Sequence, residues 1–187
     1  MTTYIALLRA VNVAGQNLIG MPALCDFVRK LGFADAKSLL QSGNLVFRGE
    51  KQTGAQLEAL LEREAAKRLS LQTDFFIRSD REWRRVVERN PFPKEAQDDP
   101  GRLVVVFLKN DAKNVDDLRA GIRGPERVSD DGRHLYIVYP DGQGRSKLTG
   151  ALIEKKLGTR GTARNWNTVL KLAAATKSPA TRDRETP

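Results

Sequence analysis

The sequence predicts an α+β fold made of two ferredoxin-like (split βαβ, alpha-beta plait) subdomains and a C-terminal helix. Short apolar runs typical of strands alternate with segments whose apolar residues recur at helical spacing. The first half gives the order β-α-β-β-α-β, and the second half repeats that order in part. We expect the subdomains to cover residues 1–90 and 91–176, and residues 177–187 to form a flexible tail.

The chain opens with a strand, a loop and a helix. The apolar run over residues 4–11 predicts the strand, and the polar residues 12–17 form the loop that follows it. Pro22 is typical of a first helical turn, where its missing backbone N–H costs nothing. Apolar residues then recur at helical spacing up to Gly32, which suits a C-terminal cap.

A β-hairpin, a second helix and a strand complete the first half. Two short apolar runs lie on either side of Ser42-Gly43-Asn44, and they predict a hairpin over residues 37–48. We expect glycine and asparagine in this turn because both tolerate positive φ. Thr53 is suited to capping the next helix, and residues 73–78 read as its following strand.

A capping box and a pair of prolines mark the expected boundary between the halves. Ser79 and Glu82 have the spacing of a capping box at a helix start. Asn90-Pro-Phe-Pro93 is expected to end that helix, because proline cannot continue it. Beyond this boundary we expect a strand over 103–108, a helix over 112–122 and a hairpin over 126–139. A helix marked by Leu148 and closed by Gly158, a strand over 160–164 and a final helix capped by Asn165 follow.

Composition excludes several classes of protein. Apolar residues make up 40% of the chain, too many for a disordered protein, and a single cysteine cannot form an internal disulfide. No apolar run approaches the ~20 residues of a membrane helix. The first apolar run has no basic residues before it, so a secretory signal is not expected. We therefore expect a soluble, cytoplasmic protein that does not bind membranes.

Positive charge is concentrated in the last quarter of the chain. The net charge is +9, and residues 142–187 hold ten Lys or Arg against three Asp or Glu. Residues 1–141 hold 22 basic and 20 acidic residues. A patch of one sign raises the local concentration of the opposite charge. This charge favours an anionic partner, either a small molecule or a nucleic acid. A charged surface that only keeps the protein soluble is an equal alternative.

Several strings resemble a bacterial family known as domain of unknown function 1697. They are Leu8-Arg-Ala-Val-Asn-Val-Ala-Gly-Gln-Asn17, Gln41-Ser-Gly-Asn-Leu-Val-Phe47, Asn90-Pro-Phe-Pro93, Ser146-Lys-Leu-Thr149 and Arg164-Asn-Trp-Asn-Thr-Val169. The resemblance covers roughly residues 3–176. It implies a pair of ferredoxin-like subdomains and no particular reaction. Members often have glycine at the positions of Ala10 and Ala14, and lysine at that of Gln16, so this loop departs from the pattern.

The first candidate ligand-binding residues lie in the loop and the hairpin turn of the first half. Arg9, Asn12 and Asn17 lie where a strand end and a helix start could present donors to an anion. An ordinary loop, whose asparagines bond their own backbone, is the favoured alternative. Ser42 and Asn44 are also candidates, although a plain hairpin turn is the stronger interpretation because no Gly-x-Ser-x-Gly motif is present.

The remaining candidates lie near the C-terminus. Arg164 and Asn167 flank Trp166, which begins an apolar stripe, and are therefore expected on the polar side of the last helix. A guanidinium offers paired donors to phosphate or carboxylate. Lys147 is expected to open the preceding helix and to join them if folding brings these segments together. One histidine, His134, cannot by itself build a metal site, and neither a metal nor a cofactor is expected.

Three functions remain open at this point. The first is a module that binds an anionic ligand, and the second is an enzyme acting on a small phosphorylated or carboxylated substrate in a cleft between the subdomains. The third is a structural or interaction module without a small ligand. Twelve aromatic residues are sparse for a stacking platform, so an RNA-recognition mechanism based on stacked bases is disfavoured.

Overall fold

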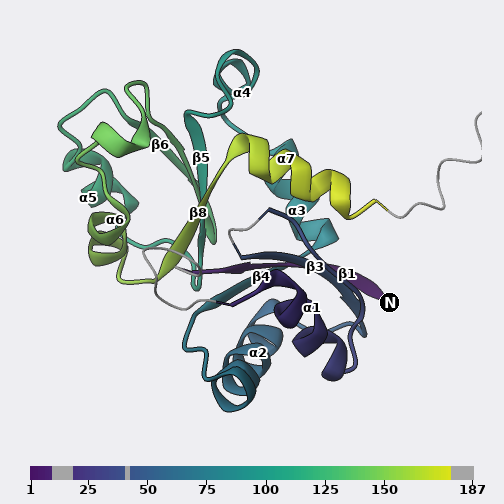
Figure 1. Cartoon of the computed structure of the whole chain (residues 1–187). Coiled ribbons are helices and arrows are strands. Elements are labelled where there is room, and N and C mark those ends of the chain that lie inside the picture. Colours follow the sequence, from purple (N-terminus) through teal and green to yellow (C-terminus); the bar gives the residue numbers. More distant parts are fainter. Residues whose placement is uncertain (10–18, 41–42, 178–187) are drawn as a thin grey trace, which may run out of the picture. The chain divides into compact units, whose positions relative to one another are not determined.

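A computed structural model describes residues 1–9, 19–40 and 43–177 (Figure 1). The predicted loop over 12–17, Ser42 and all but Lys177 of the predicted tail lie outside these residues. The chain divides into two units, the first comprising Met1–Arg85 and Leu170–Pro187 and the second Val86–Val169. The subdomain limits expected from the sequence, residues 1–90 and 91–176, stay a prediction.

The first unit is a four-stranded antiparallel sheet with two helices on one face (Figure 1). The strand order is β2-β3-β1-β4, the order of a ferredoxin-like fold, in which each βαβ crossover is split by a strand between its two strands. Its elements are β1 (Thr2–Leu8), α1 (Met21–Lys30), β2 (Ala34–Ser38), β3 (Asn44–Gly49), α2 (Gly54–Leu69) and β4 (Phe75–Ser79), followed by α3 (Asp80–Glu88).

Local signals set the helix ends of the first unit. Pro22 lies in the first turn of α1, and Gly32 has φ +91° just beyond its end. The backbone N–H groups of Gly32 and Phe33 bond back to the last turn of the helix, which is the Schellman arrangement. At α3, Ser79 Oγ accepts from the backbone N–H of Glu82 (3.3 Å), and the Glu82 carboxylate accepts from the backbone N–H of Ser79 (2.8 Å). The predicted capping box is confirmed.

The core of the first unit lies between the helices and one face of the sheet. Alternate residues of the strands point to this face, and apolar residues from α1 and α2 pack onto them. Its fully buried members are Ala6, Leu24, Val28, Leu45, Phe47, Leu57, Leu61, Ala65, Phe75 and Ile77. The intervening strand residues, such as Ile5, Leu7 and Phe76, are also buried, so neither face of this sheet is an open platform.

The second unit repeats the same topology. Its antiparallel sheet has the order β6-β7-β5-β8, in which each strand takes the place of the strand four numbers lower in the first unit. Its elements are α4 (Pro93–Asp98), β5 (Leu103–Leu108), α5 (Val115–Ala120), β6 (Arg127–Asp131), β7 (His134–Val138), a 3-10 turn η1 (Gln143–Arg145), α6 (Gly150–Leu157) and β8 (Gly161–Asn165), and α7 (Trp166–Ala175) begins within it. The predicted pair of ferredoxin-like subdomains is confirmed.

The core of the second unit lies on the face of the sheet that α5 and α6 cover (Figure 1). Val104, Val106 and Leu108 of β5 point to this face, where Leu118 of α5 and Ile153 of α6 pack against them. Val105 and Phe107 alternate with these residues and point to the opposite face, where they are also buried.

Several boundaries differ from those expected. The helix α3 ends at Glu88, just before Asn90-Pro-Phe-Pro93, as expected, but Pro93 then begins α4, a helix the sequence did not indicate. Among the described residues between β2 and β3, Leu40 (φ +61°) and Gly43 (φ +67°) have positive φ, whereas Asn44 already belongs to β3. Leu148 lies before α6, whose N-terminal cap is Thr149. Across the residues that the structure describes, no helix is both long and apolar enough to cross a membrane.

Candidate functional site

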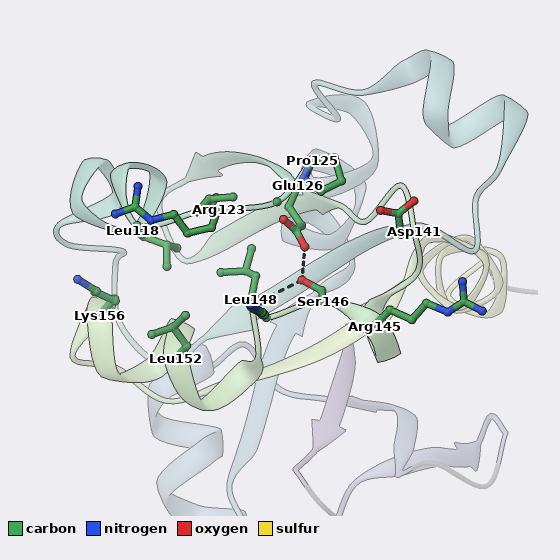
Figure 2. Close-up of a pocket in the computed structure, with 14 residues that line it drawn as sticks. Leu118, Arg123, Pro125, Glu126, Asp141, Arg145, Ser146, Leu148, Leu152 and Lys156 are labelled. Carbon is green, nitrogen blue, oxygen red and sulfur yellow. Dashed lines mark hydrogen bonds between the residues drawn. The ribbon is translucent and has the colours of Figure 1, made fainter.

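The second unit contains a pocket of about 560 Å³ between the α5 end, the segment before α6 and α6 itself (Figure 2). Its lining comes from three parts of the chain: Leu118 and residues 121–126, Asp141 and residues 145–148, and Leu152 and Lys156 on α6. A volume of this size is within the roughly 300–1,000 Å³ of ordinary small-molecule sites. The pocket is the strongest candidate site in the described part of this unit.

The floor of the pocket is apolar because it is continuous with the core. Leu118 and Leu148 belong to the buried cluster on the helix face of the sheet, and Ile122 and Leu152 pack against it. Leu148 is held in place by its neighbours, since its carbonyl accepts from Tyr139 Oη at 3.0 Å. Burial raises the pKa of Tyr139 to about 12, with the charge of Glu126 adding to the rise, so this hydroxyl stays a donor at neutral pH.

Four basic side chains surround this floor: Arg123, Arg145, Lys147 and Lys156. All four are exposed. Elsewhere arginines such as Arg89 and Arg119 are paired with carboxylates. Within residues 1–9, 19–40 and 43–177, none of the four pocket cations takes part in an ion pair. None of these four charges is therefore neutralised by a direct ion pair within the described residues.

Two carboxylates also line the pocket, Glu126 and Asp141. Ser146 Oγ donates a hydrogen bond to Oε1 of Glu126 and accepts one from the backbone N–H of Leu148 at 2.9 Å. Figure 2 shows Glu126 and Ser146 facing each other in the middle of the pocket, with Arg123 and Lys156 toward one end and Arg145 toward the other. The serine thus fixes the position of one carboxylate among the cations.

Of the predicted site residues that the structure describes, Lys147 alone lines this pocket. Arg164 does not join it. Ala163 of β8 packs against the core on the helix side, so its neighbour Arg164, paired with Val105, points to the opposite face of the sheet. There the Arg164 guanidinium donates to Thr162 Oγ1 (2.9 Å) and to the Ala163 carbonyl (2.8 Å). Desolvation lowers its pKa to about 10, which leaves it charged at pH 7.

The other predicted residues lie elsewhere. Asn167 is exposed in the first turn of α7, while Asn165 caps that helix by accepting from the backbone N–H of Thr168 at 3.0 Å. In the first unit, Arg9 lies 3.6 Å from the carboxylate of Asp74. Asn44 is fully buried and its side chain donates to the carbonyl of Leu39 at 2.9 Å, which is a turn-stabilising role.

Comparison with known proteins places the chain in a family. Residues 1–136 match the model of a family described as a protein of unknown function, DUF1697. The chain belongs to the DUF1697 family. The matched residues include the Leu118–Glu126 side of the pocket and end before Arg145. The comparison with curated proteins finds no match.

A solved structure shares the fold of this DUF1697 chain. This chain is similar to the conserved bacterial protein SP0830 from Streptococcus pneumoniae, with a TM-score of 0.73 and 23% sequence identity. The similarity covers 94% of this chain and 99% of that one. At this identity the match shows the fold alone, and it agrees with the topology of the two sheets.

Aromatic side chains of this DUF1697 protein are turned inward. Eleven of its twelve Phe, Trp and Tyr residues are buried. The twelfth, Phe92, is half-buried and lies under the guanidinium of Arg127, 5.2 Å from its ring centre. Stacking of nucleic-acid bases needs exposed aromatic faces, so no such platform exists here. Among the described residues, no cluster of His, Cys, Asp or Glu has the arrangement of a metal site.

Sequence reasoning missed most of the pocket. Arg123 and Glu126 come from the segment after α5, which carries no motif, and the apolar floor combines residues of α5, of α6 and of the segments beside them. One signal did point this way: Arg145, Lys147 and Lys156 all belong to the basic last quarter of the DUF1697 chain. Charge asymmetry therefore indicated the region, while the pairing of its cations with an apolar floor depends on tertiary packing.

Proposed function

We propose that the second unit binds a small anionic molecule, phosphorylated or carboxylated, in the pocket between α5 and α6. The observation that carries the proposal is the set of four pocket cations that have no ion-pair partner among the described residues, placed around a floor of leucine and isoleucine. Four cations against two carboxylates leave the lining with an excess of positive charge, which attracts an anion.

The chemistry of the lining suits such a ligand. Arg123 and Arg145 can each offer paired N–H donors to phosphate or carboxylate, and Lys147 and Lys156 add point charges. The apolar floor supports a ligand body that is not itself charged. A ligand with an anionic group and an apolar or ring-shaped body fits this combination better than a bare inorganic ion does.

The inward placement of the aromatic side chains supports a small molecule over a nucleic acid. Single strands are held by exposed aromatics as well as by basic residues, and only the basic residues are present. A nucleic acid bound through phosphates alone would show a steep fall in affinity with salt, because several counterions are released. A small ligand held by two or three cations shows a much shallower dependence.

Calorimetric titration of the full chain tests the proposal. The probes are inorganic phosphate, guanosine and adenosine monophosphates, benzoate and a single-stranded oligonucleotide, each at two salt concentrations. We expect at least one small anion to bind, and Arg123→Gln/Lys156→Gln to weaken it by about tenfold, the loss of roughly 1.4 kcal/mol. Lys113→Gln/Lys155→Gln is the control, since both residues are exposed, carry the same charge and lie outside the pocket.

The possible outcomes distinguish binding in the pocket from attraction by net charge. Equal weakening by the pocket pair and the control pair would mean that net charge, and not the pocket, attracts the ligand. Failure of every small anion to bind would overturn the proposal, as would binding of the oligonucleotide alone. A small anion that binds the wild type and the control pair, but not the pocket pair, supports it.

A further inference from the structure

One carboxylate of the pocket does not suit a site whose ligand is an anion without hydrogen-bond donors. Glu126 lies in the middle of the lining, where it would repel any negatively charged group placed beside it. Neighbouring residues nevertheless hold this carboxylate in its position. Ser146 donates to its Oε1, and the same hydroxyl is tied to the backbone N–H of Leu148.

Gly124 makes room for the same carboxylate. A Cβ at this position would overlap Oε2 of Glu126 and would lie 2.9 Å from its carboxyl carbon. The φ angle of Gly124 is not in the left-handed region, so the backbone conformation alone does not require glycine there. The missing side chain leaves space for the Glu126 carboxylate where it lies, and Ser146 holds that carboxylate by a hydrogen bond.

Glu126 keeps unused acceptor capacity. An ionised carboxylate can accept about four hydrogen bonds, and Ser146 supplies one. The described residues give Glu126 no ion pair, although cations lie around it. A ligand group that donates hydrogen bonds would therefore find an acceptor at the centre of the pocket, with cations toward both ends for its anionic part (Figure 2).

We infer that Glu126 determines specificity, and that the ligand is a nucleoside monophosphate whose base carries paired N–H donors, as guanine does. This inference rests on the proposed function. Guanine presents two adjacent N–H donors that match a carboxylate, whereas adenine places an acceptor nitrogen beside its amino group and would bring that nitrogen against Glu126. The flat base lies against Leu148 and Leu152, and the phosphate reaches the cations.

Gly124 and Ser146 are positioning residues in this account. Ser146 holds the Glu126 carboxylate and Gly124 leaves room for it, so Gly124→Ala and Ser146→Ala are expected to displace that carboxylate and to reduce discrimination between bases, but not the attraction of phosphate. Asp141 supplies the matched control, because it is the other carboxylate of the lining and none of the hydrogen bonds or ion pairs found among the described residues holds it in place.

The test is a calorimetric titration of guanosine and adenosine monophosphates into the full chain and its variants. The wild type is expected to bind the guanine nucleotide at least tenfold more tightly. Glu126→Gln replaces an acceptor oxygen with a donor NH2, so that preference is expected to fall to below threefold, with Gly124→Ala giving an intermediate loss. Asp141→Asn removes the same charge and is expected to retain the preference. Thermal unfolding of each variant confirms that it is folded.

Four results would overturn the inference while leaving the proposed function standing. The first three are equal binding of the two nucleotides by the wild type, an unchanged preference in Glu126→Gln, and an equal loss in Asp141→Asn. The fourth is binding of benzoate or inorganic phosphate without either nucleotide. Failure of every anion to bind is the separate result that removes the proposed function itself.

Discussion

The carboxylate of Glu154 on α6 accepts a hydrogen bond from the backbone N–H of Gly161 on β8, at 2.9 Å. In the first unit, Glu62 on α2 accepts in the same way from Phe75 on β4, at 2.8 Å. Both strands are sheet edges, whose outward N–H groups could otherwise pair with another chain. The two units therefore share an edge-covering device as well as a strand order.

The hydrogen bond from Gly161 to Glu154 predicts that the Gly161 amide loses protection from hydrogen exchange when Glu154 is shortened. Glu154→Ala removes the acceptor, so hydrogen exchange at the Gly161 amide is expected to accelerate by about tenfold. Glu154→Gln keeps an acceptor oxygen and is expected to change the rate much less. Unaltered exchange at Gly161 in the alanine variant would contradict the assignment.

A buried ion pair in the first unit predicts a large loss of stability. Arg78 is fully buried, and its Nη1 lies 3.5 Å from the carboxylate of Glu58, which also accepts from the backbone N–H of Ile77. Arg78→Met leaves that carboxylate buried without its positive partner, and the free energy of unfolding is expected to fall by about 3–5 kcal/mol in a urea titration. The double variant Arg78→Met/Glu58→Gln should recover more than half of the loss. A single-variant loss below about 1 kcal/mol would rule out this account of the pair.

Tyr139 predicts a loss of stability at alkaline pH. Its pKa is about 12 in the folded protein, mainly through burial, against about 10 in an unfolded chain. Above pH 10 the unfolded state releases this proton first, so stability is complete below pH 10 and is lost as the pH rises toward 12. Between pH 9 and pH 11 this side chain is expected to contribute a loss of roughly 1 kcal/mol. Urea titrations should show a smaller decrease in Tyr139→Phe than in the wild type; equal decreases would contradict the prediction.

Close packing at Gly49 predicts a clash on substitution. A Cβ there would lie 2.7 Å from the Phe33 ring, which belongs to the core of the first unit. Gly49→Ala is expected to lower the free energy of unfolding by about 1–3 kcal/mol, as overpacking does. Replacing the ring by Phe33→Leu in the same chain should reduce the loss in free energy of unfolding that Gly49→Ala causes. If Gly49→Ala costs the same in both backgrounds, the ring is not the cause.

The sequence predicted well those features that neighbouring residues control. The Ser79 capping box, the φ of +64° at Gly158 and the Asn165 cap each depend on a few adjacent residues, and all three are present. The strand over Leu103–Leu108 was also predicted with the correct limits, because six successive apolar residues suit a strand buried on both faces.

Features that depend on distant residues were not predictable in this way. Proline breaks a helix and also begins one, so Pro93 could not by itself reveal α4. The alternation of β8 turns Arg164 away from the face that carries Lys147, and this depends on the register with β5. The pocket joins stretches of chain that periodicity treats separately, which is why Arg123 and Glu126 were not among the expected site residues.

The most direct measurement is amide chemical-shift mapping of the isotopically labelled full chain with guanosine monophosphate. The account predicts shifts concentrated at residues 121–126 and 145–148, the two segments that meet at the Glu126–Ser146 hydrogen bond. Shifts confined to the first unit, or to the β8 face that holds Arg164, would contradict it.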